Sequence, residues 1–321
     1  MNEAGYKLKS ITKKLDDIMK VGIALGSGGA RGFAHIGILK ILTKANIDCT
    51  VVTGSSIGAL VGAAYAAGNL HLLEKAVHDI SLADLPRLLS PTWSLSGFFS
   101  GKNALELLMN VIGVEKIEDL PKTFASVSTD LQTSSIIPCT NGDLRSALRS
   151  SMAIPAVFTP VTTASQILVD GGLLEPVPVE ICKQLGADFV IAVDLFGETY
   201  CSLEPEETKT ANTLWPSDIR TALQYLRSLP NRLCFMGLEP DKSSMAQPAT
   251  NIISIIERTL AIAQRAITEA RLSKNKPDVI LKPPVSHVGL LDFHRSKPVI
   301  EIGEITALEK LEEIKLKLKN L

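Results

Sequence analysis

The chain has 321 residues, enough for one large domain with a sizeable core, and 45% of them are apolar, as in globular proteins. Its formal net charge of −1 excludes the strongly basic balance that draws a protein to nucleic acid, so no nucleic-acid partner is expected. Five scattered cysteines without a CxxC pair disfavour a disulfide framework and a zinc site, and they favour a reducing compartment.

An amphipathic helix is predicted for residues 1–19, whose apolar side chains recur at spacings of three and four, at Leu8, Ile11, Leu15 and Ile18. Lysines line the other side, so the helix either docks on its own domain or makes a peripheral contact with an anionic membrane surface. The stretch lacks the continuous apolar core of an export signal. We therefore expect a cytoplasmic protein, with any lipid contact at the inner membrane surface.

The next elements follow the order strand, helix, strand, helix. VGIAL at 21–25 predicts a buried strand, GSGGARG at 26–32 a loop, and 33–47 has helical periodicity. CTVVTG at 49–54 predicts a second strand, and 59–68 a helix that stops at Gly68. Because the connections are short, the two strands are expected to be parallel neighbours.

Further along, 92–99 (TWSLSGFF) has a loop-like, aromatic composition, 104–113 a helical one, and 124–130 that of a strand. The proline-broken stretch 151–161 is expected to be irregular, whereas 166–172 (QILVDGG) predicts a strand that ends in an Asp-Gly-Gly turn. A helix at 179–186 and a buried strand at 188–195 follow. The pattern indicates one α/β domain with a mainly parallel sheet.

The predicted organisation has three parts: the helix at 1–19, a catalytic core at 20–195, and 196–321 as the C-terminal part of the same domain. Within the last part, 197–250 is poor in periodic signal and is interpreted as an insertion or a mobile surface segment. An amphipathic helix at 251–272, a strand at 278–284 and a charged helix at 307–320 complete the chain.

Ser56 stands between two glycines where the second strand becomes a helix, in GSSIG at 54–58. A sharp strand-to-helix turn exposes a serine hydroxyl, and it needs small residues two before and two after the serine. A base can then take the hydroxyl proton, and the helix N-terminus favours the negative charge that develops. The pattern predicts a nucleophilic Ser56, with an ordinary tight turn as the alternative, and a Ser55 side chain that points elsewhere.

The glycine-rich loop at 26–32 has two interpretations. One is a dinucleotide site with Asp48 as the ribose-binding acid, but GxGxxG requires a glycine where Arg31 stands. The other is an oxyanion hole built from the N–H groups around Gly28, Gly29 and Arg31, since glycines let an amide approach a substrate closely. Adjacent parallel strands would bring this loop beside Ser56, which favours the second interpretation.

Two kinds of base are compatible with the residues alone. A triad needs a histidine, and of the five, His287 and His294 follow the serine in the order of an α/β-hydrolase, although that fold carries more sheet before its nucleophile. Alternatively, Asp170 ends an apolar strand and precedes two glycines, so its carboxylate can project into a site. Burial would raise its basicity. An ordinary Asp-Gly turn is the structural alternative for Asp170.

GSGGARG, GSSIG and DGG, in this order and spacing, resemble the patatin-like phospholipase family over about residues 20–195, and the stretch from 251 onward resembles its bacterial members. The resemblance implies a three-layer α/β/α fold and a Ser–Asp dyad hydrolase of phospholipid or lysophospholipid that needs no cofactor and no metal. It matches Ser56 to the nucleophile and Asp170 to the base. The oxyanion loop then corresponds to Gly28, Gly29 and Arg31.

Two departures from the family pattern lie near this site: Gly26-Ser27, where an Asp-Gly pair is common, and Glu175-Pro176, where many members have asparagines. The stretch 92–99 is interpreted either as a lining of an acyl channel or as a packed loop. Two other functions are kept as alternatives to the lipid acyl hydrolase. They are a nucleotide-binding oxidoreductase and a non-catalytic interaction protein on the same fold.

Overall fold

The structure is a computed structural model of the chain, and it describes residues 19–94, 96–197 and 252–321. The sheet and the pocket belong to one compact unit, to which the described residues up to 197 and from 256 onward contribute. Apart from residues 19 and 197, the predicted helix at 1–19 and insertion at 197–250 lie outside the described residues.

A mixed sheet forms the centre of the fold. Its main path runs in the order β11 (Val279–Leu281), β10 (Phe189–Val193), β1 (Val21–Leu25), β2 (Cys49–Ser55), β5 (Thr123–Asp130), β9 (Ile167–Asp170) and β8 (Val161–Thr162). The first five of these strands are parallel. Past the end of β2, β9 pairs with the last part of β5 in antiparallel fashion, and β8 pairs likewise with β9. β6 (Ser135–Cys139) pairs antiparallel with the opposite edge of β5. The prediction of a mainly parallel α/β sheet is confirmed.

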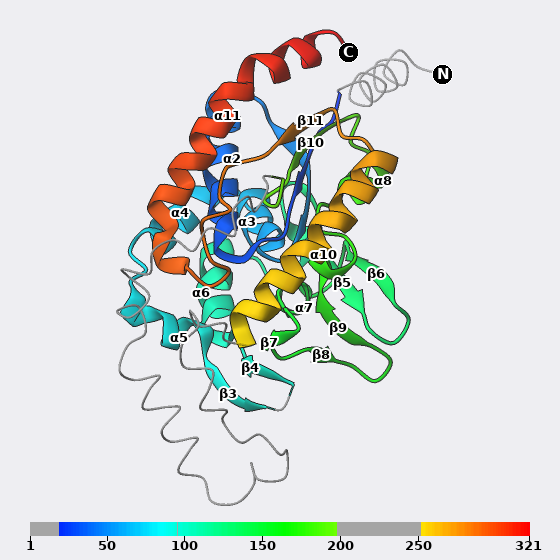
Figure 1. Cartoon of the computed structure of the whole chain (residues 1–321). Helices are drawn as coiled ribbons and strands as arrows, with labels where there is room; N and C mark the ends of the chain where they lie inside the picture. Colours follow the sequence, from blue (N-terminus) through cyan, green and yellow to red (C-terminus); the bar gives the residue numbers. More distant parts are fainter. Residues whose placement is uncertain (1–18, 95, 198–251) are drawn as a thin grey trace, which may run out of the picture. The chain divides into compact units, whose positions relative to one another are not determined.

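Helices cover both faces of this sheet (Figure 1). On one side, a single apolar cluster joins the strands to α2 (Ala34–Lys44), α3 (Ile57–Ala66), α4 (Leu70–His78), α6 (Lys102–Ile112), α7 (Leu144–Ser151) and α11 (Ser296–Lys319). The other face packs against α8 (Val179–Gln184) and the C-terminal part of α10 (Ile252–Lys274). The result is the expected three-layer α/β/α arrangement. Among the described residues, no helix combines the length and apolarity needed to cross a bilayer.

Alternation along the strands assigns each side chain to one of the two layers. In β1, Ile23 and Leu25 enter the larger apolar cluster, whereas Ala24 enters the smaller one beneath α8. In β10, Ile191 and Ala192 divide in the same way. Strands that are buried on both faces read as continuous apolar runs, which explains why VGIAL is apolar throughout.

A small second sheet corrects two expectations. The sequence predicts a loop for 92–99 and irregular structure for 151–161, but β4 (Gly97–Phe99) pairs with both β3 (Pro91–Ser94) and β7 (Ala156–Phe158). Pairing between β4 and β7 is long-range, and it overrides the local signal of the prolines. The remaining short elements are α5 (Leu85–Leu89) and the 3₁₀ turns η1 (Gly29–Phe33), η2 (Leu82–Asp84), η3 (Ile117–Asp119), η4 (Gly171–Leu173) and η7 (Phe293–Arg295).

Candidate active site

Two strands meet end to end along one edge of β5. β2 pairs with the first part of β5, with Ser55 opposite Val127, and β9 pairs with the last part, with Asp170 opposite Ser128. β6 occupies the other edge of β5 over the same last part. Because β2 runs parallel to β5 and β9 antiparallel, the carboxyl ends of β2 and β9 face each other. The residue after Ser55 therefore lies beside Asp170.

Ser56 stands at the strand-to-helix turn in a strained backbone conformation. Its φ is 55° and its ψ −125°, a region that L-residues rarely occupy and that costs about 1–3 kcal/mol. The flanking glycines permit the turn: a Cβ at Gly54 would lie 2.3 Å from the Gly58 carbonyl carbon, and a Cβ at Gly58 would lie 2.2 Å from the Leu25 oxygen. The small residues of GSSIG are therefore required by close backbone contacts.

Hydrogen bonds hold this turn in place. The Ser56 N–H donates to Ser151 Oγ at 2.9 Å, and that hydroxyl donates to the Val127 carbonyl at 2.6 Å. The neighbouring Ser55 hydroxyl donates instead to the Glu175 carbonyl at 2.6 Å, so it points away from the pocket. Ser56 precedes the first turn of α3, whose N-terminal N–H groups favour negative charge at its hydroxyl.

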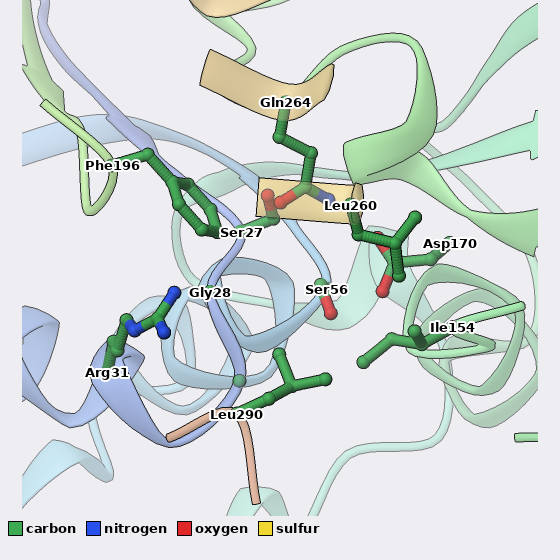
Figure 2. Close-up of a pocket in the computed structure, with 11 residues that line it drawn as sticks. Ser27, Gly28, Arg31, Ser56, Ile154, Asp170, Phe196, Leu260, Gln264 and Leu290 are labelled. Carbon is green, nitrogen blue, oxygen red and sulfur yellow. The ribbon is translucent and has the colours of Figure 1, made fainter. Parts of the chain in front are cut away.

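Asp170 is buried next to the serine, and Figure 2 shows the two side chains beside each other in the pocket. Its Oδ1 accepts the Gly172 N–H at 2.7 Å, whereas Oδ2 accepts no hydrogen bond of normal geometry from the described residues. Burial raises the pKa of this carboxyl to about 7, although the Ser56 hydroxyl and the Gly172 N–H act in the opposite direction. A carboxyl with such a pKa can accept and return a proton near neutral pH.

The glycine-rich loop comes to the same place from the end of β1. Gly29 has φ +57°, and a Cβ there would lie 2.3 Å from the Leu290 oxygen, so only glycine fits without strain. The Ala30 N–H donates to that oxygen at 2.9 Å. Within the described part of the chain, no loop or turn hydrogen bond is formed by the N–H groups of Gly28 and Gly29. Both can therefore donate to a ligand at the start of η1.

The Arg31 side chain is buried and contacts two other segments of the chain. It is 1% exposed, its Nε donates to the Val288 carbonyl at 2.6 Å, and its guanidinium carbon lies 5.3 Å from the centroid of the Phe196 ring. The guanidinium thus ties the glycine-rich loop to the segment that carries Leu290.

All five residues predicted for the site line one narrow pocket: Ser56, Asp170, Gly28, Gly29 and Arg31. Its volume of about 20 Å³ is room for about one water molecule. The sequence interpretation missed the rest of the lining, which consists of the apolar Ile154, Phe196, Leu260 and Leu290 and the polar Ser27 and Gln264. Gln264 and Leu290 carry no sequence signal, since their position depends on how the last third of the chain packs.

The competing interpretations have no support in this geometry. No histidine lines the pocket, and His35, the buried one, bonds through Nε2 to the Gly26 oxygen at 2.8 Å. Burial lowers the pKa of His35 to about 4. Asp48, the acid of the dinucleotide interpretation, forms an ion pair with Lys122 before β2 begins, at the end opposite Ser56. Among the described residues, no three His, Cys, Asp or Glu side chains are grouped as metal ligands would be.

Comparison with known proteins decides the family. The sequence model of the patatin-like phospholipases matches residues 23–183, half of the chain, and this span begins in β1 and ends in α8. An uncharacterized NTE family protein of Mycobacterium tuberculosis is 31% identical over 92% of both chains. The chain belongs to the patatin-like phospholipase family. The family supports a lipid hydrolase as the class of enzyme.

Two eukaryotic relatives of this patatin-like chain carry functional names. Lysophospholipase NTE1 of Pyricularia oryzae is 26% identical over 92% of the chain, and the neuropathy target esterase of Drosophila melanogaster is 34% identical over 54%. The matched region makes up 18% and 13% of those two proteins, respectively. The patatin-like chain thus corresponds to a small part of each.

The two sequence departures of this patatin-like protein have different surroundings. Ser27 lines the pocket, and its buried hydroxyl has no partner among the described residues. Glu175 does not line the pocket and forms an ion pair with Arg271. The stretch 92–99 does not line the pocket, but Phe99 packs on Phe158 in the apolar cluster that includes Ile154 and Leu290.

Proposed function

We propose that the protein is a serine acyl-ester hydrolase acting on phospholipid or lysophospholipid, with Ser56 as nucleophile and Asp170 as its base. The observation that carries the proposal is the meeting of a strained serine that lines the pocket with a buried carboxyl of raised pKa, beside the backbone N–H groups of Gly28 and Gly29. Nucleophile, base and oxyanion donors are the three parts that acyl transfer requires.

The proposed reaction begins with attack of Ser56 Oγ on the ester carbonyl carbon, while Asp170 accepts the hydroxyl proton. The N–H groups of Gly28 and Gly29, with the Arg31 amide, stabilise the oxyanion of the tetrahedral intermediate. Removing one such donor typically costs about 10²–10³ in kcat. Asp170 then returns the proton to the leaving alcohol, and an acyl-serine remains. Water, deprotonated by Asp170, releases the fatty acid and restores Ser56.

The substrate is expected to place its acyl chain along the apolar wall. Ile154, Leu260 and Leu290 form this wall and continue into a cluster of Met152, Phe158 and neighbouring side chains. With room for about one water, the pocket must widen between these side chains to admit an ester. A lipid substrate is found at a membrane surface. We therefore propose that the protein makes a peripheral contact with the cytoplasmic side of a membrane.

Fatty-acid release from defined lipids tests the proposed function. Lysophosphatidylcholine and its diacyl counterpart are presented to the protein in mixed micelles, and mass spectrometry follows the products. We expect fatty-acid release, with the single-chain lipid hydrolysed faster because it presents one chain to a narrow pocket and because a relative is named a lysophospholipase. No release from either lipid, or from a short p-nitrophenyl ester, would overturn the proposal.

The pH dependence of kcat/KM provides a second test. Asp170 must be ionised to accept a proton, and burial raises its pKa to about 7. We therefore expect kcat/KM to rise about tenfold per pH unit below 7 and to level off above it. Glu175 also has a pKa of about 7, so the profile is measured in Glu175→Gln as well. If the acid limb were absent or vanished in that variant, Asp170 would not be the titrating base.

A further inference from the structure

The segment Leu174–Pro178, which follows the Asp-Gly-Gly turn, is bonded to each of the three motifs of the site. The Ser27 N–H of the glycine-rich loop donates to the Pro176 carbonyl at 2.9 Å. The Ser55 hydroxyl, next to the nucleophile, donates to the Glu175 carbonyl at 2.6 Å. The Glu175 N–H donates to the Gly171 carbonyl at 2.8 Å. We call Leu174–Pro178 the frame segment, because its position sets the spacing of the three motifs.

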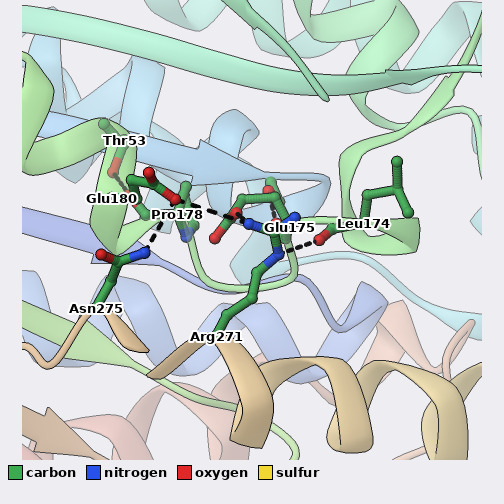
Figure 3. Close-up of polar contacts among 8 residues, drawn as sticks. Thr53, Leu174, Glu175, Pro178, Glu180, Arg271 and Asn275 are labelled. Atoms are coloured by element: carbon green, nitrogen blue, oxygen red, sulfur yellow. Dashed lines mark hydrogen bonds and ion pairs between the residues drawn. The ribbon is translucent and has the colours of Figure 1, made fainter. Parts of the chain in front are cut away.

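The Arg271 side chain, from α10, binds this frame segment through two contacts. Arg271 donates from Nε to the Leu174 carbonyl at 2.6 Å, and a second nitrogen of the same guanidinium lies 2.7 Å from the Glu175 carboxylate (Figure 3). A planar guanidinium can make both contacts at once, which an ammonium on a flexible stem cannot do with equal precision. The Glu180 carboxylate lies 3.8 Å from the Arg271 guanidinium. The same carboxylate accepts a hydrogen bond from the Asn275 side-chain amide at 2.9 Å.

The buried Glu175 carboxylate depends on the Arg271 guanidinium as its countercharge. The Glu175 side chain is 3% exposed, and burial raises its pKa to about 7 while Arg271 acts to lower it. Without the guanidinium, a carboxylate would be left buried with no countercharge, or would take up a proton. The contact also fixes the helix that carries Leu260 and Gln264, two residues of the pocket lining. Arg271 thus joins the wall of the pocket to its catalytic motifs.

We infer that Arg271 is a positioning residue for ester hydrolysis, acting through the frame segment on the alignment of Ser56, Asp170 and the oxyanion loop. The inference rests on the proposed function. Arg271 does not line the pocket, and its contacts described above reach Leu174 and Glu175 rather than the proposed reacting groups. Displacing reacting groups by about 1 Å can cost about 10²-fold in rate, so loosening the frame segment should lower turnover without removing any reacting group.

The test compares Arg271→Met with Arg265→Met on the same helix. Arg265 pairs with Glu269 at 3.0 Å across an exposed turn of α10, so it is a matched control in which an arginine ion pair is lost away from the frame segment. We expect Arg271→Met to lower kcat and the rate of fluorophosphonate labelling at least tenfold, with KM changed less than threefold. Arg265→Met should keep both rates within twofold of the wild type.

A double variant separates positioning from stability. Glu175→Gln combined with Arg271→Met removes the unpaired buried charge, so the melting temperature should return toward the wild-type value. The contact to the Leu174 carbonyl is still missing, so kcat should stay low. Recovery of kcat together with melting temperature, or full activity of Arg271→Met, would overturn the inference. Lack of hydrolysis and labelling by the wild type would instead reject the proposed function.

Discussion

Replacing Ser56 by alanine is expected to abolish ester hydrolysis, lowering kcat by about 10⁵-fold or more, as loss of an activated serine does in serine hydrolases. The Ser56 hydroxyl makes no capping hydrogen bond to α3, so its removal leaves the helix start intact. The positive φ is retained at similar cost, because alanine and serine are equally disfavoured there. Turnover of a chromogenic ester and the melting temperature, measured side by side, provide the check.

Ser55→Ala is the matched control for this variant, since it removes the neighbouring hydroxyl. Ser55 donates to the Glu175 carbonyl in the frame segment, so its loss should lower turnover less than tenfold. If the two variants behaved in the opposite way, the nucleophile would be Ser55 and the interpretation of the strand-to-helix turn would be wrong.

Replacing Asp170 by asparagine is expected to lower kcat by about 10³–10⁴-fold, the contribution of a base that takes the proton from a nucleophile. Asparagine has the same shape and can still accept the Gly172 N–H, so the Asp-Gly-Gly turn should persist. Asp194→Asn is the control, because Asp194 is another buried acid of raised pKa that does not line the site pocket. Asp194→Asn should keep kcat within threefold of the wild-type value. If both variants lost kcat equally, the loss in Asp170→Asn could not be assigned to a base at Asp170.

Asp170→Asn should increase the stability of the fold although it lowers activity. The folded-state pKa of Asp170 is raised from 3.8 to about 7, so folding favours the protonated carboxyl. This acid therefore costs stability as the pH rises from about 4 through 7, and the cost is full above the folded pKa. Asp170→Asn removes that cost. Its melting temperature should exceed the wild-type value at pH 8 by more than it does at pH 5.

The half of the site that is local in sequence could be predicted from the residues. A strand, a glycine-rich turn and a helix, followed by a strand and GSSIG, occupy consecutive segments, and parallel neighbours with short connections bring the two turns to one edge. Small residues at Gly54 and Gly58 are dictated by contacts within or next to the motif itself. Such features follow from chain order and sterics alone.

The other half depends on contacts between distant parts of the chain. Asp170 reaches Ser56 because β9 runs antiparallel along the edge of β5 that β2 leaves free, and no residue of QILVDGG encodes that direction. Likewise, Gln264 enters the pocket only because α10 packs over the turn at Gly172, where an added Cβ would lie 2.5 Å from its amide. The pairing of β4 with β7 was missed for the same reason.

The most direct test of the pairing of Ser56 with Asp170 is to map a fluorophosphonate adduct by peptide mass spectrometry while following its rate of formation across pH. The account predicts one adduct per chain, on Ser56, whose rate rises with pH to a plateau above about 7 and falls at least 10³-fold in Asp170→Asn. An adduct on any other residue, or a rate on Ser56 that is unaffected by Asp170→Asn, would contradict it.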